Sequence, residues 1–265
     1  MINTKDEQFL TEQTSFGDFA ILSAIGDRTE QQDSFGYLID YDLGLFIVCD
    51  GMGGHECGKL ASEYAVQEFV ACFRERMPNE NMRERLHKCA IAADRRVALL
   101  AADKGGGVVS GCTLLAVVID ADKLHWCSVG DSRAYLMRGG EFVQFTKDQN
   151  YLTVLDEQLN AGVITRQEYN ERRFKGDALI NYVGIGDLSF LDYSESPLKL
   201  KKNDVIIVMT DGLYRLVNEE DMKQLTENFG NVSDAIRALY TKANRIANRQ
   251  KIKRDNITAI LIKYK

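Results

Sequence analysis

The sequence predicts an α+β protein built from antiparallel β-sheets with helices packed on their faces. Short apolar, β-rich runs recur along the chain, several of them are joined by short turns, and long amphipathic segments lie among them. Short turns imply antiparallel pairing, because a parallel pair needs a crossover connection of about a dozen residues. Sheets of this kind bury their apolar faces against each other or against helices.

The expected elements follow from periodicity and composition. Apolar β-rich runs predict strands over residues 19–25, 34–39, 45–49, 112–119, 123–129, 132–138, 205–209 and 257–262. Apolar residues at helical spacing predict helices over residues 60–77, 82–102 and 232–247. The turns at residues 121–122 and 138–140 are expected to join neighbouring strands as hairpins.

Residues 148–187 are less periodic than the rest of the chain and are expected to form a surface flap. Within them, Asn160-Ala161-Gly162 is typical of a helix end, and Thr165 with Glu168 predicts a capping box that opens a short helix. The chain has only two prolines and no Ser/Gly-rich linker. We therefore expect a single domain over residues 1–265, with the flap at about 148–187.

Composition excludes several classes of protein. The 45% hydrophobic content supports a sizeable core, and the net charge of −6 is the wrong sign for a nucleic-acid binder, which is usually basic. No apolar run approaches the roughly 18 residues that a membrane helix needs, and residues 1–10 lack the apolar core of a secretion signal. We expect a cytoplasmic protein that binds neither nucleic acid nor membranes.

The six cysteines are irregularly spaced and include no Cys-x-x-Cys pair. Several lie in apolar surroundings, where a free thiol behaves as a small hydrophobic side chain. A zinc site needs clustered Cys and His, whereas the three histidines lie far apart in the sequence. We expect buried thiols and no disulfide framework.

Aspartates fall at the ends of predicted strands. Asp50-Gly51 follows strand 45–49, Asp131 follows strand 123–129, Asp211 follows strand 205–209, and Asp255 precedes strand 257–262. A single Asp-Gly pair is typical of a hairpin turn, but Asp50-Gly51 leads through a glycine-rich stretch into a helix. Four carboxylates can converge on one rim only if a cation offsets their repulsion.

These residue types predict a site for hard divalent cations. Mg²⁺ and Mn²⁺ prefer carboxylate, carbonyl and water oxygens, and the glycine lets the Gly51 carbonyl approach as a ligand. Two such ions about 4 Å apart acidify a water molecule, which suits hydrolysis of phosphate esters. Arg28 lies at the end of the first predicted strand, where its guanidinium is suited to hold a phosphate by two parallel hydrogen bonds.

Six blocks resemble, in order, the metal-dependent protein phosphatases of the PPM/PP2C family, especially the bacterial members. They lie at residues 28–33, 50–55, 111–113, 130–133, 210–213 and 255–258, and the resemblance covers about residues 17–263. It implies a β-sandwich of two antiparallel sheets flanked by α-helices, with a flap insertion. It also implies hydrolysis of phosphoserine and phosphothreonine on proteins by a hydroxide that bridges two metal ions.

The resemblance assigns roles to individual residues. Asp50 would bridge two Mg²⁺ or Mn²⁺ ions, with the Gly51 carbonyl, Asp211 and Asp255 completing the pair. Asp131 and Asp211 would hold a third ion. Arg28 would bind the substrate phosphate, and Asp33 would act with Asp50 and Asp211 in catalysis by orienting the attacking water. Implied partners are phosphorylated proteins, with a cognate Ser/Thr kinase among those that fit, and the protein is expected to be a monomer.

The sequence departs from the family pattern at several positions. Gln31-Gln32 replaces a pair that usually carries an acidic residue, Lys59 stands where glutamate is common, and Gln149-Asn150 replaces a frequent His-Ser. Met52 occupies the position where some eukaryotic relatives have a histidine as leaving-group acid, so the proton donor would be metal-bound water or His55. The glutamine pair motivates an alternative, a pseudophosphatase that binds phosphoproteins without turnover.

A second alternative is a cysteine-dependent phosphatase. Residues 127–133 fit the pattern Cys-x-x-Gly-x-x-Arg, in which backbone amides at a helix N-terminus surround the phosphate and a low-pKa thiolate attacks. Here the pattern leads into a predicted strand, and Asp131 would place a carboxylate inside the cradle. Both features disfavour a thiol mechanism.

Overall fold

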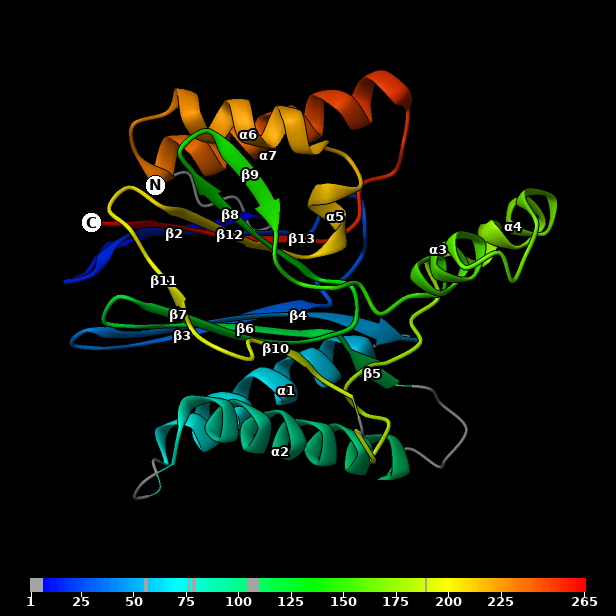
Figure 1. The fold of residues 1–265 in the computed structure, drawn as a ribbon, viewed down its shortest axis with the longest axis horizontal. Coiled ribbons are helices and arrows are strands. Elements are labelled where there is room, and N and C mark those ends of the chain that lie inside the picture. The colour runs from blue at the N-terminus through cyan, green and yellow to red at the C-terminus, as the bar shows by residue number, and fades with distance from the viewer. Residues whose placement is uncertain (1–6, 55–56, 76, 78–79, 104–109, 189) are drawn as a thin grey trace.

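The computed structural model describes residues 7–265, apart from residues 55–56, 76, 78–79, 104–109 and 189. Within the described residues, two antiparallel β-sheets lie face to face, and helices cover the outer side of each sheet (Figure 1). The layers run helix, sheet, sheet, helix. This arrangement confirms the predicted α+β sandwich.

The first sheet has six strands, which are, in spatial order, β1 (Glu7–Gln13), β2 (Gly17–Ala24), β13 (Ile257–Tyr264), β12 (Val205–Met209), β8 (Arg133–Arg138) and β9 (Glu141–Gln144). Helices α6 (Glu219–Asn228) and α7 (Val232–Gln250) pack on its outer face (Figure 1). Because β13 pairs with both β2 and β12, segments from the beginning and the end of the chain are hydrogen-bonded neighbours.

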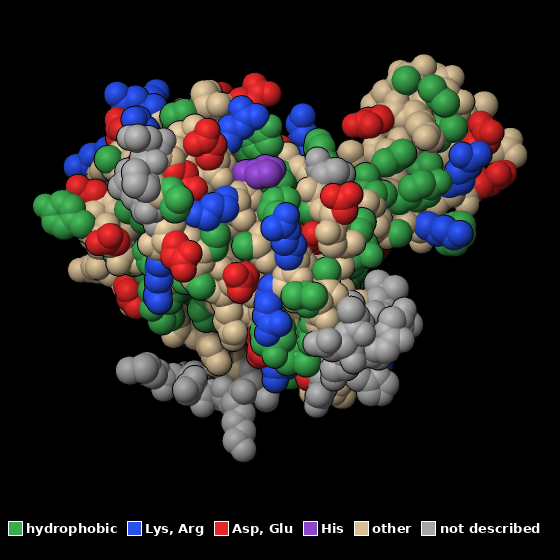
Figure 2. All heavy atoms as spheres, turned by 90° about the horizontal axis from the view of Figure 1, so that it is seen from below, with side chains coloured by type: hydrophobic (Ala, Val, Ile, Leu, Met, Phe, Trp, Pro, Cys, Tyr) green, Lys and Arg blue, Asp and Glu red, His purple; other side chains and the backbone are tan. Residues whose placement is uncertain are grey.

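The second sheet contains, in spatial order, β10 (Asp192–Tyr193), β7 (Lys123–Val129), β6 (Leu114–Asp120), β4 (Leu43–Gly53) and β3 (Asp33–Asp40). Two short strands lie off this path: β11 (Leu198–Lys199) pairs with β7, and β5 (Ser110–Cys112) pairs with β4. Helices α1 (Cys57–Arg74) and α2 (Met82–Asp103) cover its outer face. Figure 2 shows this helical side, where positive and negative side chains are interspersed.

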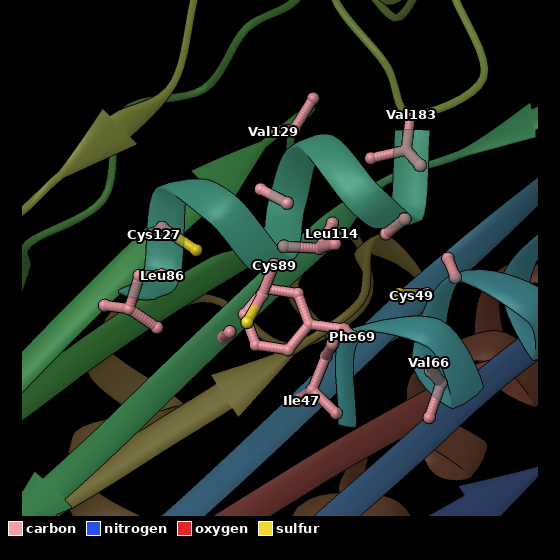
Figure 3. Packing of buried hydrophobic residues seen from close by; sticks show 14 of the residues in the cluster. Ile47, Cys49, Val66, Phe69, Leu86, Cys89, Leu114, Cys127, Val129 and Val183 are labelled. Carbon is pink, nitrogen blue, oxygen red and sulfur yellow. The ribbon is translucent and has the colours of Figure 1, made fainter. Parts of the chain in front are cut away.

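The central strands are buried on both faces, because side chains of successive residues point to opposite sides of a sheet. In β4, Phe46 and Val48 pack between the two sheets, whereas Leu45 and Ile47 pack against the helices. Figure 3 shows Ile47 beside Phe69 of α1 in this outer core. Burial on both faces explains why these strands are continuous apolar runs in the sequence.

All of the predicted strands and helices occur, with shifted ends. The predicted strand 112–119 is interrupted at Thr113 and divides into β5 and β6. Both predicted hairpins are confirmed, since β6 pairs with β7 and β8 pairs with β9 across the expected turns. The prediction did not include β1, β9 or α6. These are the more polar elements: in β1, for example, only Phe9 and Leu10 are large and apolar.

The predicted flap contains α3 (Tyr151–Asn160), α4 (Arg166–Arg172) and a single 3₁₀ turn, η1 (Arg173–Lys175). These helices project from the sandwich as a separate lobe, at the right of Figures 1 and 2. The predicted capping box is present, because the Thr165 and Glu168 side chains each accept a hydrogen bond from the other residue's backbone N–H. Gly162, with φ of +70°, follows the end of α3 in a conformation that favours glycine.

All six cysteines are buried and free, as the sequence predicts. They pack as small apolar groups, and Cys49, Cys89 and Cys127 belong to the core between the second sheet and its helices (Figure 3). Among the helices that the structure describes, none combines the length and the apolar character that crossing a bilayer requires.

Candidate active site

The four strand-end aspartates line one cleft next to the flap. Asp50 lies near the end of β4, Asp131 follows β7, Asp211 opens the short helix α5 (Asp211–Tyr214), and Asp255 precedes β13. The cleft has a volume of about 420 Å³. Its lining residues are Arg28, Gln32, Asp50, Gly51, Met52, Gly53, Thr113, Asp131, Asp177, Ala178, Leu179, Asp211, Arg215, Asp255 and Asn256. The structure thus brings together residues from seven separate stretches of the sequence.

Two glycines allow the cleft's backbone segments to pack closely. A Cβ atom added to Gly212 would lie 2.0 Å from the carbonyl oxygen of Asn256, and one on Gly51 would lie 2.2 Å from the carbonyl oxygen of Gly58. Neither position accepts a side chain without movement of the backbone. The start of α5 is thereby held against the loop before β13, and the end of β4 against α1.

Asp33 lies behind the cleft rather than in its wall. It pairs with Asp50 in the register of β3 and β4 and is 5% exposed. Thr210 donates a hydrogen bond from its hydroxyl to Asp33 Oδ2 at 2.8 Å, whereas Asp33 Oδ1 has no hydrogen-bond partner among the described residues. One buried carboxylate oxygen of Asp33 is therefore available to accept a proton or a hydrogen bond.

Both arginines in the cleft wall are bound to aspartates. Arg28 Nη2 lies 2.6 Å from Asp255 Oδ2, and Arg215 Nη2 lies 2.9 Å from Asp211 Oδ2. Arg215 also donates from Nη1 to Asp177 of the flap at 3.2 Å. The sequence pattern pointed to Arg28 but not to Arg215 or Asp177. No motif marks that ion pair, because its two residues meet only through the fold.

The cleft raises the pKa values of its own carboxyl groups. Burial raises the pKa of Asp50 well above its usual range, and repulsion from Asp33 and Asp211 adds to the effect. Burial likewise raises the pKa of Asp131 to about 6 and that of Asp211, although Arg215 opposes both shifts. The pKa of Asp33 rises to about 7, again chiefly through burial. The arginines therefore offset only part of the cleft's negative potential.

Asn256 ties the loop that carries Arg28 to the start of β13. Its Oδ1 accepts a hydrogen bond from the backbone N–H of Gln32 at 2.9 Å, and its Nδ2 donates to the carbonyl oxygens of Ile25 and Glu30. Asn256 follows Asp255 directly, so the same short segment supplies a cleft carboxylate and holds the arginine loop beside it.

Thr113 has a similar supporting role on the opposite wall. Its hydroxyl accepts a hydrogen bond from the backbone N–H of Asp50 at 2.8 Å, and its own N–H donates to the Asp50 carbonyl oxygen at 2.8 Å. Thr113 is the residue at which the predicted strand 112–119 is interrupted. The break between β5 and β6 thus fixes the backbone of Asp50.

The residues that depart from the family pattern make structural contacts. Gln31 donates from its side chain to the Ser23 hydroxyl at 2.8 Å. Gln149 accepts from the Gly130 N–H and from Asn181, and donates to the Ser128 carbonyl oxygen, so it holds the segment that carries Asp131. Lys59 is half-buried on α1, Met52 lines the cleft, and His55 lies outside the described residues.

The donor set fits a hard divalent cation. Carboxylates with raised pKa values, next to a glycine whose backbone is packed into the cleft wall, are oxygen ligands of the kind that Mg²⁺ and Mn²⁺ prefer. Among the described residues, however, no three Asp, Glu, His or Cys side chains are already arranged around one point as they would be around an ion. The arginine contacts explain this, because Asp255 is directed to Arg28 and Asp211 to Arg215.

The structure disfavours the thiol mechanism. Cys127 lies inside β7 and is 1% exposed, and burial raises the pKa of its thiol far above the usual range. The segment after Asp131 is strand β8, so no helix N-terminus faces the thiol. Arg133, the last residue of the pattern, is instead bound to Asp148 through two guanidinium nitrogens.

Comparison with known proteins agrees with this geometry. The family model for protein phosphatase 2C matches residues 22–242. The chain belongs to the protein phosphatase 2C family. Among its relatives, the serine/threonine phosphatase stp of Listeria innocua is 27% identical over 239 residues, which cover 89% of this chain and 90% of the relative.

Solved structures of the same family share the fold of this chain. The serine/threonine phosphatase of S. agalactiae superposes with a TM-score of 0.76 at 25% identity, covering 97% of this chain and 98% of that one. The catalytic domain of the serine/threonine protein phosphatase PstP, solved in complex with two manganese ions, gives a TM-score of 0.72 at 22% identity, with 97% and 99% coverage. These protein phosphatase 2C relatives give no support to the pseudophosphatase alternative.

Proposed function

We propose that this chain hydrolyses phosphoserine and phosphothreonine on proteins with the help of Mg²⁺ or Mn²⁺. The observation that carries the proposal is the cleft itself, in which Asp50, Asp131, Asp211 and Asp255 converge from separate elements around Arg28. Membership of the protein phosphatase 2C family and the names of the relatives support protein substrates and Ser/Thr specificity. We assign residues 1–265 to one phosphatase domain, with the flap at about 148–187.

The proposed ligands are the residues that line the cleft. Asp50, the Gly51 carbonyl, Asp211 and Asp255 would hold two divalent cations, and Asp131 with Asp211 a third. When bound, such cations supply an acidified water molecule as nucleophile and stabilise the phosphate charge. The raised pKa values of Asp50, Asp131 and Asp211 support this set, because burial and, to a smaller extent, neighbouring carboxylates disfavour their ionised forms, and a bound cation relieves that cost.

Arg28 is proposed to bind the substrate phosphate. Its guanidinium lies in the cleft wall and already makes a carboxylate contact with Asp255, so a phosphate oxygen can replace that partner with the same donor geometry. Asn256 holds the Arg28 loop in place through two backbone carbonyls. The arginine would neutralise charge on the phosphate oxygens as the phosphorus–oxygen bond breaks.

Asp33 is proposed to orient the attacking water. Its Oδ2 is held by the Thr210 hydroxyl, which leaves Oδ1 as the free acceptor on a residue whose backbone pairs with that of Asp50. A buried acceptor fixed in this way positions a water molecule at low entropic cost to the reaction. Asp50 and Asp211 would complete the catalytic set by holding the cations that supply the attacking water.

Partners and location follow from the proposed reaction. A phosphoserine or phosphothreonine phosphatase acts on what a Ser/Thr kinase has modified, so we propose a cognate kinase and its phosphorylated targets as partners. We also propose that the protein acts as a monomer and that it meets these targets in the cytoplasm.

A phosphopeptide assay tests the proposal. The protein should release inorganic phosphate from a phosphothreonine peptide with Mn²⁺ or Mg²⁺, and should stop when a chelator is added. Alkylation of thiols should leave the rate unchanged, because the cysteines are buried. Turnover that persists in chelator would overturn the metal assignment, and Mn²⁺ binding without turnover on any phosphopeptide would favour the pseudophosphatase alternative.

A further inference from the structure

Arg215 contacts a carboxylate on each side of the cleft. Its Nη2 forms an ion pair with Asp211 Oδ2 at 2.9 Å, and its Nη1 donates to Asp177 Oδ2 at 3.2 Å. Asp211 is a proposed cation ligand at the start of α5, whereas Asp177 belongs to the flap. Both contacts use the same guanidinium group, so one side chain links the cation site to the flap.

Asp177 lies where the flap returns to the sandwich. The backbone N–H of Tyr151 donates to the Ala178 carbonyl oxygen at 2.8 Å, and that of Leu152 donates to the Gly176 carbonyl oxygen at 2.9 Å. These bonds close the base of the flap on either side of Asp177. The side-chain contact between Asp177 and Arg215 connects this base to the residues that follow α5, at the wall of the cleft.

The same contact sets up a competition for Asp211. Arg215 holds Asp211 Oδ2, and a divalent cation needs an oxygen of this carboxylate as a ligand. The guanidinium and the cation also repel each other at this range. The contact with Asp177 is exposed, with the Asp177 side chain 75% accessible, so it is weak enough for cation binding to shift it.

We propose that Arg215 is a positioning residue that couples cation binding at Asp211 to the attachment of the flap. Without the cation, Arg215 holds Asp177 and Asp211 together and draws the flap base toward α5. Cation binding at Asp211 takes this carboxylate away from Arg215. The Arg215 side chain is then held less firmly beside α5, and the attachment of the flap through Asp177 is loosened. The inference rests on the proposed function, because it requires Asp211 to take part in cation binding.

Coupling of this kind is reciprocal, so it has consequences at both ends. Removing the guanidinium should strengthen cation binding. Removing the flap carboxylate should strengthen it by a smaller factor, because Asp177 then no longer helps to hold Arg215 against Asp211. Arg172→Gln is the matched control. Like Arg215→Gln, it removes one positive charge from an arginine that is paired with a carboxylate. Arg172, however, lies on the flap and is paired with Glu168, outside the cleft.

Calorimetric titration with Mn²⁺ tests the cation side. We expect Arg215→Gln to bind Mn²⁺ about fivefold more tightly, Asp177→Asn to bind it more tightly by a smaller factor, and Arg172→Gln to match the unaltered protein. Arg215→Lys keeps the charge but not the two-pronged contact, and should fall between Arg215→Gln and the unaltered protein. Equal affinities for Arg215→Gln and the unaltered protein would overturn the coupling.

Hydrogen exchange tests the flap side without reference to activity. In chelator, amides of residues 150–179 should exchange about two- to fivefold faster in Arg215→Gln and Asp177→Asn than in the unaltered protein. Addition of Mn²⁺ should speed this exchange in the unaltered protein and change it little in Arg215→Gln. Exchange that is independent of both Mn²⁺ and Arg215 would show that the flap is held by its backbone bonds alone.

The two failures are distinguishable. If the unaltered protein bound no Mn²⁺ and released no phosphate, the proposed function would be wrong. If it did both, but Arg215→Gln altered neither the Mn²⁺ affinity nor the flap exchange, only the role of Arg215 would be wrong.

Discussion

Asp27 and Arg254 hold each other through both side chains and backbone, although they lie 227 residues apart in the sequence. The Asp27 carboxylate accepts from Nε and Nη2 of Arg254, at 3.0 and 2.5 Å, and from its backbone N–H at 2.9 Å. In return, the Asp27 N–H donates to the Arg254 carbonyl oxygen at 3.0 Å. The next residue in each loop is a cleft residue, Arg28 in one case and Asp255 in the other.

This double contact predicts an indirect effect on catalysis. Asp27→Asn should lower kcat/KM about tenfold, because a charge-assisted fork is lost and Arg28 and Asp255 are no longer held in register. Exchanging the two residues, in Asp27→Arg with Arg254→Asp, should restore part of the activity in a steady-state assay. The matched control is Asp204→Asn, which breaks the fork between Arg138 and Asp204. Asp204→Asn should lower the melting temperature and leave kcat/KM unchanged. If it also lowered kcat/KM, the effect of Asp27→Asn could not be attributed to the positions of Arg28 and Asp255.

Asp50 is expected to oppose stability in the absence of metal. Its pKa is raised by burial and by neighbouring carboxylates, so ionising it near neutral pH costs the folded state free energy. Asp50→Asn should therefore raise the melting temperature in chelator and abolish the stabilisation that Mn²⁺ gives to the unaltered protein. Thermal unfolding with and without Mn²⁺ measures both effects. A variant that melts lower in chelator, yet still responds to Mn²⁺, contradicts the assignment.

Loss of either central aspartate should stop turnover without unfolding the protein. Asp50→Ala and Asp211→Ala are each expected to reduce kcat by orders of magnitude, since each removes a proposed cation ligand. Circular dichroism should show unchanged secondary structure, because neither side chain belongs to the apolar cores. Near-normal phosphate release from either variant would contradict the assignment of that aspartate as a cation ligand.

Gly212 should tolerate no side chain. In Gly212→Ala the new methyl group would meet the Asn256 carbonyl oxygen, so α5 and the loop before β13 must separate. We expect a loss of about 1–3 kcal/mol in the free energy of unfolding, together with weaker Mn²⁺ binding. Urea denaturation and calorimetry measure these. Gly230→Ala, where the added methyl meets open space, is the control and should change neither quantity.

His125 predicts how stability changes with pH. Burial on β7 lowers its pKa below the ordinary value of 6.5, so the unfolded chain takes up the proton at a higher pH than the folded protein does. Its contribution to stability is therefore complete above about pH 6.5 and is lost as the pH falls through the folded-state pKa. The decline in urea midpoint between about pH 7.5 and 5.5 should be shallower in His125→Gln, since histidine titrates in this range. His87→Gln, on the exposed side of α2, should retain the full decline.

Much of the fold could be predicted because its information is local. The ends of β7 and β12 agree with the predicted ranges, since β12 is apolar over its whole length, most of β7 is apolar, and turn residues lie on both sides of each. The four cleft aspartates could be predicted because each lies next to one end of a predicted strand. What β1 and α6 lack is this apolar pattern: β1 is a half-exposed edge strand, and α6 buries only Met222 and Thr226.

The supporting contacts of the site could not be predicted in the same way. Arg215 with Asp177, and Asp27 with Arg254, are ordinary charged residues in the sequence, and their partners are set by how the loops meet at the cleft. Thr113 was included in a strand because its neighbours are apolar, whereas its hydroxyl holds the Asp50 backbone. Pairings of this kind depend on tertiary arrangement rather than on spacing.

The central place of β13 has a consequence for synthesis of the protein. A ribosome makes β13 after every other strand of the two sheets, yet β13 must insert between β2 and β12 to complete the first sheet, and the segment before it carries Asp255. A nascent chain that has not emerged through Tyr264 therefore has an unfilled gap in its sheet and an incomplete cleft. The sheet and the cleft are thus completed in the same step of folding.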